Sequence, residues 1–180
     1  MFKKYIGDRE FYQKLFSVMI PVLIQNVITN FVSLLDNIMV GRIGTEPMSG
    51  VAIVNQILFI FNLCVFGSLA GAGIYTAQYY GKGDQEGVRN GMRFKLWVVF
   101  GVLAVAFGLL CSFGDELISL FIHEGEDALD LSATMHYGRQ YLNVMLLQMP
   151  LFALLNVYSS TLRETGETAL PMKAGIIAVF

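Results

Sequence analysis

Charged residues are scarce in this chain of 180 residues, because lysine, arginine, aspartate and glutamate together make up only 14% of it. Soluble domains contain about 25% of these residues. The few charges are also segregated, since none occurs in residues 15–35, 47–81, 96–114 or 140–162. Each of these runs is near or above the roughly 20 residues with which a helix crosses a hydrocarbon core. The shortage of charge excludes an ordinary soluble domain and predicts an all-α integral membrane protein.

Cysteine and histidine are rarer still, with two residues of each. Cys64 and Cys111 lie in separate apolar runs and form no Cys-x-x-Cys pair, so a disulfide framework is not indicated. His123 and His136 have no helical histidine partner and no flanking cysteine, so we expect solvated histidines and no metal site. The chain also lacks a His-Glu-x-x-His motif and a nucleophile elbow. Neither an enzyme nor a cofactor is therefore expected.

Apolar segments of helical length predict five membrane spans. We expect them at about residues 15–39, 49–80, 94–113, 139–162 and 169–180. The acidic segment between the third and fourth spans alternates apolar with polar residues, which is compatible with an amphipathic helix at the membrane interface. The chain stops inside its fifth span, so we expect residues 1–180 to be an incomplete N-terminal transmembrane bundle of a longer chain.

The basic residues predict how the chain is oriented in the membrane. Ten of the 12 lysines and arginines, Lys95 among them, fall before the first span, between the second and third, or after the fourth. The other side of the membrane has only Arg42 and Arg139. Because short cytoplasmic loops carry an excess of basic residues, we expect a cytoplasmic N-terminus in a multi-pass protein of the plasma membrane.

Polar side chains form a stripe along the predicted first span. On a helix with about 100° between neighbours, they occupy one broad face, while apolar residues cover much of the opposite face. The stripe comprises Gln25, Asn26, Thr29, Asn30, Ser33, Asp36 and Asn37. A span with this pattern is expected to turn its polar side towards a bundle interior or a water-filled cavity.

Asp36 is the most informative residue of the stripe. The free-energy cost of a carboxylate inside a bilayer is at least about 2.5 kcal/mol. The predicted span that contains Asp36 has no basic residue to offset this cost. A carboxyl group in such a place can carry a proton or exchange it for a sodium ion. The alternative is that Asp36 lies at the outer end of the span and is solvated there, close to Arg42. Position in the sequence does not decide between the two.

Proline, glycine and asparagine add three further expectations. Pro21 removes one hydrogen bond from the first helix and favours a bend there. Gly67 and Gly71 are one turn apart in the second span, which predicts a close helix contact. Asn55 and Asn62 are seven residues apart and share a helical face, so the second span is also expected to present polar groups inwards.

Three stretches of the sequence, taken in order, resemble the multidrug and toxic compound extrusion (MATE) transporters. The stretch PVLIQNVITNFVSLLDNIMVGRIGTEPMSGVAI is similar to the first span of that family and the start of its second span. TAQYYGKGD is similar to the end of the second span, and TLRETGETALPM to the turn between spans four and five. The resemblance covers essentially the whole chain.

The resemblance implies a fold of twelve helices in two six-helix bundles, of which this chain would supply about four and a half helices. It also implies export of amphipathic, often cationic compounds, driven by entry of protons or sodium ions. The partners would be small cationic substrates, the lipid bilayer and the second six-helix bundle, with no nucleic acid. Asp36 would be the ion-coupling carboxylate, and Pro21 would mark a helix bend. We expect the cavity to be lined by Gln25, Asn26, Thr29, Asn30, Ser33, Asn55 and Asn62.

Two other functions stay open as alternatives. A flippase for lipid-linked oligosaccharides would use a cationic cavity to hold pyrophosphate, and the predicted spans contain almost no lysine or arginine. A non-transporting membrane module is supported only by the early stop at Phe180. The function that we expect is a cation-coupled antiporter, and the sequence does not distinguish H⁺ from Na⁺ coupling.

Overall fold

The computed structural model describes residues 8–121 and 128–179. In these ranges the chain forms five helices and no strand, which confirms the prediction of an all-α helix bundle. The helices are α1 (Arg9–Gly41), α2 (Thr45–Gly81), α3 (Gln85–Ser119), α4 (Ala128–Glu164) and α5 (Ala169–Val179). Four of them are long and apolar enough to cross a membrane, judged by length and composition.

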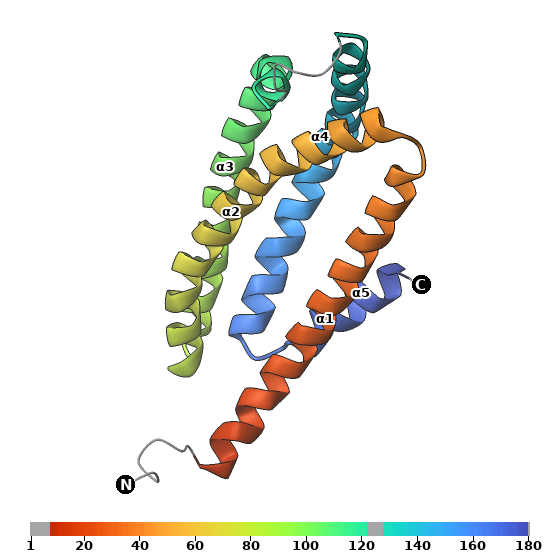
Figure 1. Cartoon of the computed structure of the whole chain (residues 1–180). Coiled ribbons are helices and arrows are strands. Elements are labelled where there is room, and N and C mark those ends of the chain that lie inside the picture. Colours follow the sequence, from red (N-terminus) through yellow and green to blue (C-terminus); the bar gives the residue numbers. More distant parts are fainter. Residues whose placement is uncertain (1–7, 122–127, 180) are drawn as a thin grey trace, which may run out of the picture.

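The long helices run back and forth between two ends of the molecule (Figure 1). The start of α1, the α2–α3 turn and the α4–α5 turn lie at one end, which we call the N-terminal end. The α1–α2 turn lies at the opposite end. Helices α2, α3 and α4 form the body of the bundle, and α1 lies along α5 at its side.

The helices extend beyond the apolar segments that predict them. Helix α3 begins at Gln85, because Asp84 caps its first turn by accepting a hydrogen bond from the backbone N–H of Gly87 at 2.9 Å. It also continues past Phe113, where the backbone bends (φ −124°, ψ 19°), and ends at Ser119. The first part of the acidic segment is therefore helical and is set at an angle to the rest of α3 by the kink at Phe113, and its place at the membrane interface stays a prediction. His123 lies outside the described residues.

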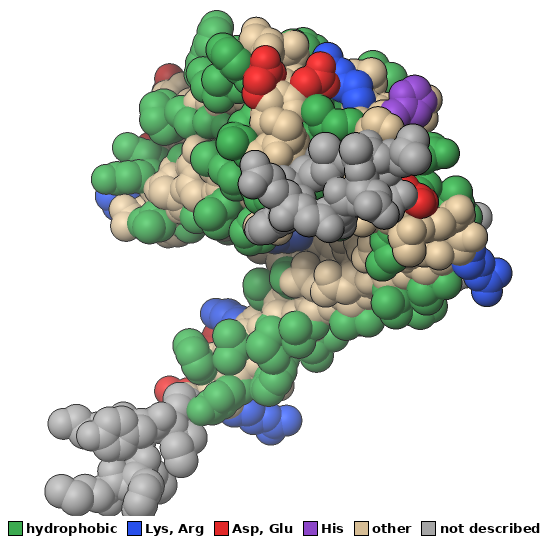
Figure 2. Space-filling model, turned by 45° about the horizontal axis from the view of Figure 1, so that its top comes forward, with side chains coloured by type: hydrophobic (Ala, Val, Ile, Leu, Met, Phe, Trp, Pro, Cys, Tyr) green, Lys and Arg blue, Asp and Glu red, His purple; other side chains and the backbone are tan. Residues whose placement is uncertain are grey.

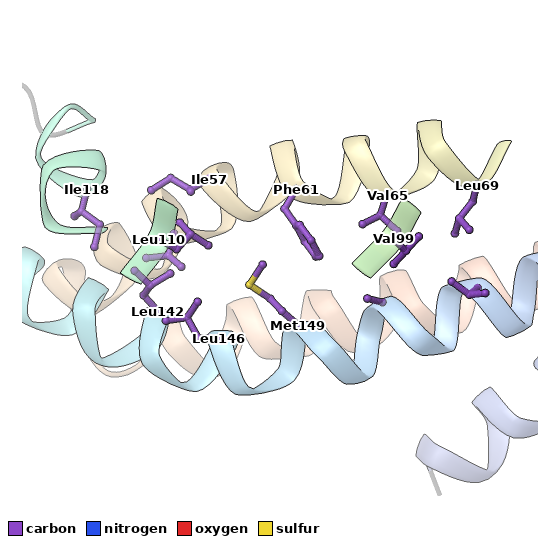
Figure 3. Packing of buried hydrophobic residues seen from close by; sticks show 13 residues of the cluster. Ile57, Phe61, Val65, Leu69, Val99, Leu110, Ile118, Leu142, Leu146 and Met149 are labelled. Carbon is purple, nitrogen blue, oxygen red and sulfur yellow. The ribbon is translucent and has the colours of Figure 1, made fainter. Parts of the chain in front are cut away.

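A stripe of buried residues along α2 makes the core of the bundle. Its members follow one another every three or four positions, which places them on one face of a helix. They are Gly50, Val54, Ile57, Phe61, Val65, Leu69, Gly73 and Thr76. Figure 3 shows Phe61 pointing from α2 towards Met149 of α4. Val99 of α3 lies close to Val65 in the same view. In lipid, such interdigitation stabilises helix association through dispersion contacts and close fit.

Helix α2 approaches the backbone of α4 at Gly50, whereas among the described residues no helix comes close to Gly67 or Gly71, so the prediction for that pair was wrong in this part of the chain. A Cβ atom added to Gly50 would lie 2.8 Å from the Gly138 nitrogen and 2.8 Å from the Thr134 carbonyl oxygen of α4. At Gly67 and Gly71 an added Cβ would meet nothing within 4 Å among the described residues. The physical reason is that neither glycine belongs to the buried stripe of α2, so both lie on faces of the helix that point away from α4.

Large apolar side chains cover the outside of the bundle (Figure 2). Trp97 and Leu147 are each 79% exposed, and Phe31 on α1 is 58% exposed. Helix α1, all of which the structure describes, contributes no fully buried residue. Water-soluble proteins rarely expose contiguous apolar surface on this scale, whereas a lipid-facing surface requires it.

Candidate functional site

A cleft of about 920 Å³ opens between the second half of α1, the first half of α2 and the middle of α4. In the space-filling view, a hollow separates the arm that contains α1 from the body of the bundle (Figure 2). Apart from its polar side chains, the cleft is lined mainly by aliphatic, methionine and phenylalanine side chains. It therefore combines one carboxylate with amides, hydroxyls and an apolar wall. Its polar side chains are Ser33, Asp36, Asn37, Arg42, Asn55, Asn62, Tyr141 and Gln148.

The polar wall of the cleft is held together across α2 and α4. The Tyr141 hydroxyl donates a hydrogen bond to Asn55 Oδ1 at 3.2 Å. Asp36 lies on the α1 side of the same cleft. Three helices that are separate in the sequence thus bring a carboxylate, an amide and a phenol to one space, which is a suitable environment for a cation or a hydrogen-bonding ligand.

The structure divides the predicted stripe of α1 into two groups. Ser33, Asp36 and Asn37 line the cleft, together with Asn55 and Asn62 of α2. The stripe is about 16 Å long from its first member to Asp36, at 1.5 Å per residue, so its two ends meet different neighbours. The other candidates lie outside the cleft lining, nearer the N-terminal end: Gln25, Asn26, Thr29 and Asn30.

Two hydroxyl groups of the stripe are satisfied by their own helix. Thr29 donates to the Gln25 carbonyl oxygen at 3.0 Å, and Ser33 donates to the Thr29 carbonyl oxygen at 3.1 Å. These bonds let hydroxyl groups occupy an apolar span at little cost. Gln25 instead makes a contact with another helix, because its Oε1 accepts a hydrogen bond from Arg163 Nη2 at 2.8 Å.

Comparison with known protein families shows what kind of bundle carries this cleft. The MatE family model matches residues 21–180, which is most of the chain. The chain belongs to the MATE family.

Curated MATE-type relatives extend the same result. A probable multidrug resistance protein NorM of Thermotoga maritima is 28% identical over 178 residues, which cover 96% of this chain and 36% of that protein. A probable multidrug resistance protein NorM of Pseudomonas syringae is 30% identical over 149 residues, covering 81% of this chain and 30% of that protein. The chain thus spans about a third of the length of these relatives. No solved structure matches it significantly.

Membership of the MATE family and the apolar helices agree that the chain is a multi-pass membrane protein. Within the described residues, no group of three or more histidine, cysteine or acidic side chains is placed to hold a metal ion. The carboxylate, amide and phenol oxygen atoms of the cleft are of the type that binds hard cations.

The sequence pattern did not single out two residues that line the cleft, Tyr141 and Gln148. They are seven residues apart in the fourth apolar run, as Asn55 and Asn62 are in the second. Seven residues make almost two helical turns, so each pair shares a face. Polar residues at this spacing in an otherwise apolar run were the available signal for the α4 side of the cleft.

Sequence reasoning also missed a buried ion pair near the N-terminal end of the MATE bundle. The charge pattern places Lys95 between the second and third spans, but its side chain is fully buried inside the bundle and pairs with Glu164 at the end of α4. The Lys95 Nζ also donates to Ser160 Oγ at 3.3 Å and to Thr161 Oγ1 at 3.5 Å. Lys95 is therefore a buried residue of the bundle and not a loop charge, so it no longer counts among the basic residues that predict the orientation.

Glu164 is sheltered by the same contact. Its side chain is 16% exposed, and a Cβ atom added to Gly73 of α2 would collide with its carboxylate. Because Gly73 has no side chain, there is space beside α2 for the Glu164 carboxylate. Three helices, α2, α3 and α4, meet at the pair.

Proposed function

We propose that this chain is part of a cation-coupled antiporter, with H⁺ or Na⁺ as the coupling ion, that exports drugs or other amphipathic organic compounds. The observation that carries the proposal is Asp36, a carboxylate on the wall of a wide cleft in a MATE-family bundle. The curated relatives bear the name multidrug resistance protein, which supports this class of substrate.

The lining of the cleft suits amphipathic cations. The Asp36 carboxylate attracts a positive charge, and the aromatic rings of Phe61 and Phe152 attract it further. Met145 and Met149 add flexible, polarisable side chains that adapt to ligands of different shape. One carboxylate in a deformable apolar wall selects for charge and size more than for a particular chemical structure.

Coupling follows if the substrate and the ion compete for Asp36. A proton or a sodium ion that enters the cleft neutralises the carboxylate, and the cationic substrate then loses its partner and leaves. By thermodynamic linkage, the substrate weakens ion binding by the same factor. In this mechanism α1 bends near Pro21 when Asp36 is neutralised, which repacks the cleft and changes the side from which it is open.

The cleft favours this function over a flippase for lipid-linked oligosaccharides. A pyrophosphate group requires several cationic side chains, whereas Arg42 is the one lysine or arginine in the described lining. The N-terminus is proposed to be cytoplasmic and the membrane to be the plasma membrane. A second six-helix bundle is proposed to complete the transporter, which agrees with the greater length of the curated relatives.

The test is Asp36→Asn in the complete gene product, reconstituted with an imposed proton or sodium gradient. The amide keeps the size of the side chain and cannot be ionised, so gradient-driven export of a fluorescent cation is expected to be lost while membrane insertion is unchanged. Glu46→Gln is the matched control, because Glu46 lies in the first turn of α2, outside the cleft. Undiminished export by Asp36→Asn would overturn the proposal.

A further inference from the structure

Pro21 leaves a backbone carbonyl group of α1 without its helical donor. In an α-helix the carbonyl oxygen of Ser17 accepts a hydrogen bond from the N–H four residues later, which is residue 21. Proline has no N–H, so this oxygen lacks its regular donor in the helix. An unsatisfied carbonyl group is costly in an apolar environment, where water does not replace the missing donor.

Thr168 supplies the missing donor from the α4–α5 turn. Its Oγ1 donates to the Ser17 carbonyl oxygen at 3.4 Å, across 151 residues of sequence. Thr168 is 5% exposed, so the contact is sheltered. The nearby Gly166 has a positive φ of 82°, which lets the chain reverse between α4 and α5 and present Thr168 to α1.

A second contact from the same region holds α1 on the other side of the proline. Arg163 Nη2 donates to Gln25 Oε1 at 2.8 Å. Ser17 and Gln25 are each four residues from Pro21, so the two contacts lie on either side of the proline. We call the two donors, Thr168 and Arg163, the clamp.

The end of α4, next to the clamp, is fixed to the body of the bundle. Glu164, the neighbour of Arg163, is paired with buried Lys95 of α3. This pair ties the end of α4 to α3, so the clamp is less free to move than α1. When the bend of α1 changes, Thr168 and Arg163 therefore stay in place, and their hydrogen bonds to α1 change.

We propose that Thr168 and Arg163 are positioning residues that set the bend of α1 at Pro21. A change in bend angle moves Ser17 relative to Gln25 and so alters the two contacts, and the clamp therefore favours the shape of α1 in which both are made. The link to transport rests on the proposed function, in which bending of α1 repacks the Asp36 cleft. The clamp itself is a statement about helix shape and can be measured without transport.

The experiment measures the distance between spin labels on Phe11→Cys and Phe31→Cys in the complete gene product in lipid. All other cysteines are replaced, which in this chain means Cys64→Ser and Cys111→Ser. Both labelled positions are exposed, and each lies ten residues from Pro21. In a straight helix they are about 30 Å apart, and a stronger bend brings them closer together.

Thr168→Val is the decisive variant, because it keeps the shape of the side chain and removes the donor. The Ser17 carbonyl group is then expected to tilt away from the helix axis towards another donor, which increases the bend and shifts the distances to shorter values. Thr168→Ser keeps the hydroxyl group and is expected to restore the parent distances. Thr165→Val is the matched control, because the Thr165 hydroxyl donates to the Thr161 and Leu162 carbonyl oxygens at the end of α4 and not to α1.

A Pro21→Ala background separates this role from a general structural one. The alanine supplies the N–H that the Ser17 carbonyl oxygen needs, so Thr168→Val is expected to lose its effect there. An unchanged distance in Thr168→Val, or the same shift with and without Pro21→Ala, would overturn the proposal.

Two further outcomes keep the test decisive. If Thr168→Val does not insert into the membrane, Gln25→Leu takes its place with Asn26→Leu as its control, and equal distances in these two variants would overturn the clamp. A shift in distance without a change in export would support the clamp and count against its role in transport. The helix shape and the proposed function can therefore fail separately.

Discussion

Tyr141 joins α4 to α2 at the cleft, because its hydroxyl donates to Asn55. Tyr141→Phe keeps the ring and removes this bond, whose net contribution is about 0.5–1.5 kcal/mol. We expect weaker binding of cationic substrates and a lower thermal midpoint in detergent. Tyr158→Phe is the control, since Tyr158 is 52% exposed and lies outside the cleft. Equal effects of the two substitutions would show that the hydroxyl of Tyr141 has no special role.

The Lys95–Glu164 pair is expected to matter more for stability than any exposed pair. Lys95→Met leaves Glu164 without its partner in a largely buried place, at a cost of about 3–5 kcal/mol. Replacing both residues with methionine is expected to cost less, because no unpaired charge remains. The exposed Lys14–Glu10 pair is the control, and Lys14→Met is expected to leave the unfolding midpoint unchanged. A double variant less stable than Lys95→Met would contradict this account.

At the residue scale the sequence was informative for single side chains and silent about pairs. The isolated acid in the first apolar run singled out Asp36. The partners Tyr141 and Asn55 are 86 residues apart, and Lys95 and Glu164 are 69 apart. Nothing in the local pattern joins such residues, because the contacts depend on which helix faces meet.

At the scale of the helix, the α2–α4 contact depends on Gly50. Gly50→Leu would force a side chain into the α4 backbone near Gly138, which we expect to cost about 1–3 kcal/mol or to separate the helices. Gly67→Leu makes the same change where an added Cβ meets no described atom within 4 Å, so its unfolding midpoint in detergent is expected to stay near that of the parent. A larger loss at Gly67 than at Gly50 would restore the original prediction.

The existence of the long helices could be predicted from apolar runs, whereas their ends and their inward faces could not. Helix α3 begins at Gln85, well before the predicted start of the third span. Hydropathy reports the part of a helix that suits lipid, but capping by Asp84 and the bend at Phe113 determine where the helix begins and how it continues.

At the scale of the whole molecule, the alternating direction of the helices places the α1–α2 and α2–α3 turns at opposite ends (Figure 1). With an N-terminus in the cytoplasm, a membrane-impermeant thiol reagent added to intact cells is expected to label Ile43→Cys and not Lys82→Cys. Both variants carry Cys64→Ser and Cys111→Ser, and both are expected to react after permeabilisation. Labelling of Lys82→Cys alone in intact cells would reverse the orientation.

The sequence by itself determined that the chain is an all-α membrane protein of the MATE family and that Asp36 is its unusual acid. These properties depend on composition, on apolar runs and on local motifs, which are all visible along one dimension. The tertiary structure decided which residues share the cleft, where Lys95 finds its partner and which hydroxyl satisfies the Ser17 carbonyl oxygen. The reason is that a helix presents several faces with similar polarity, and only packing against the other helices selects which of them turns inwards.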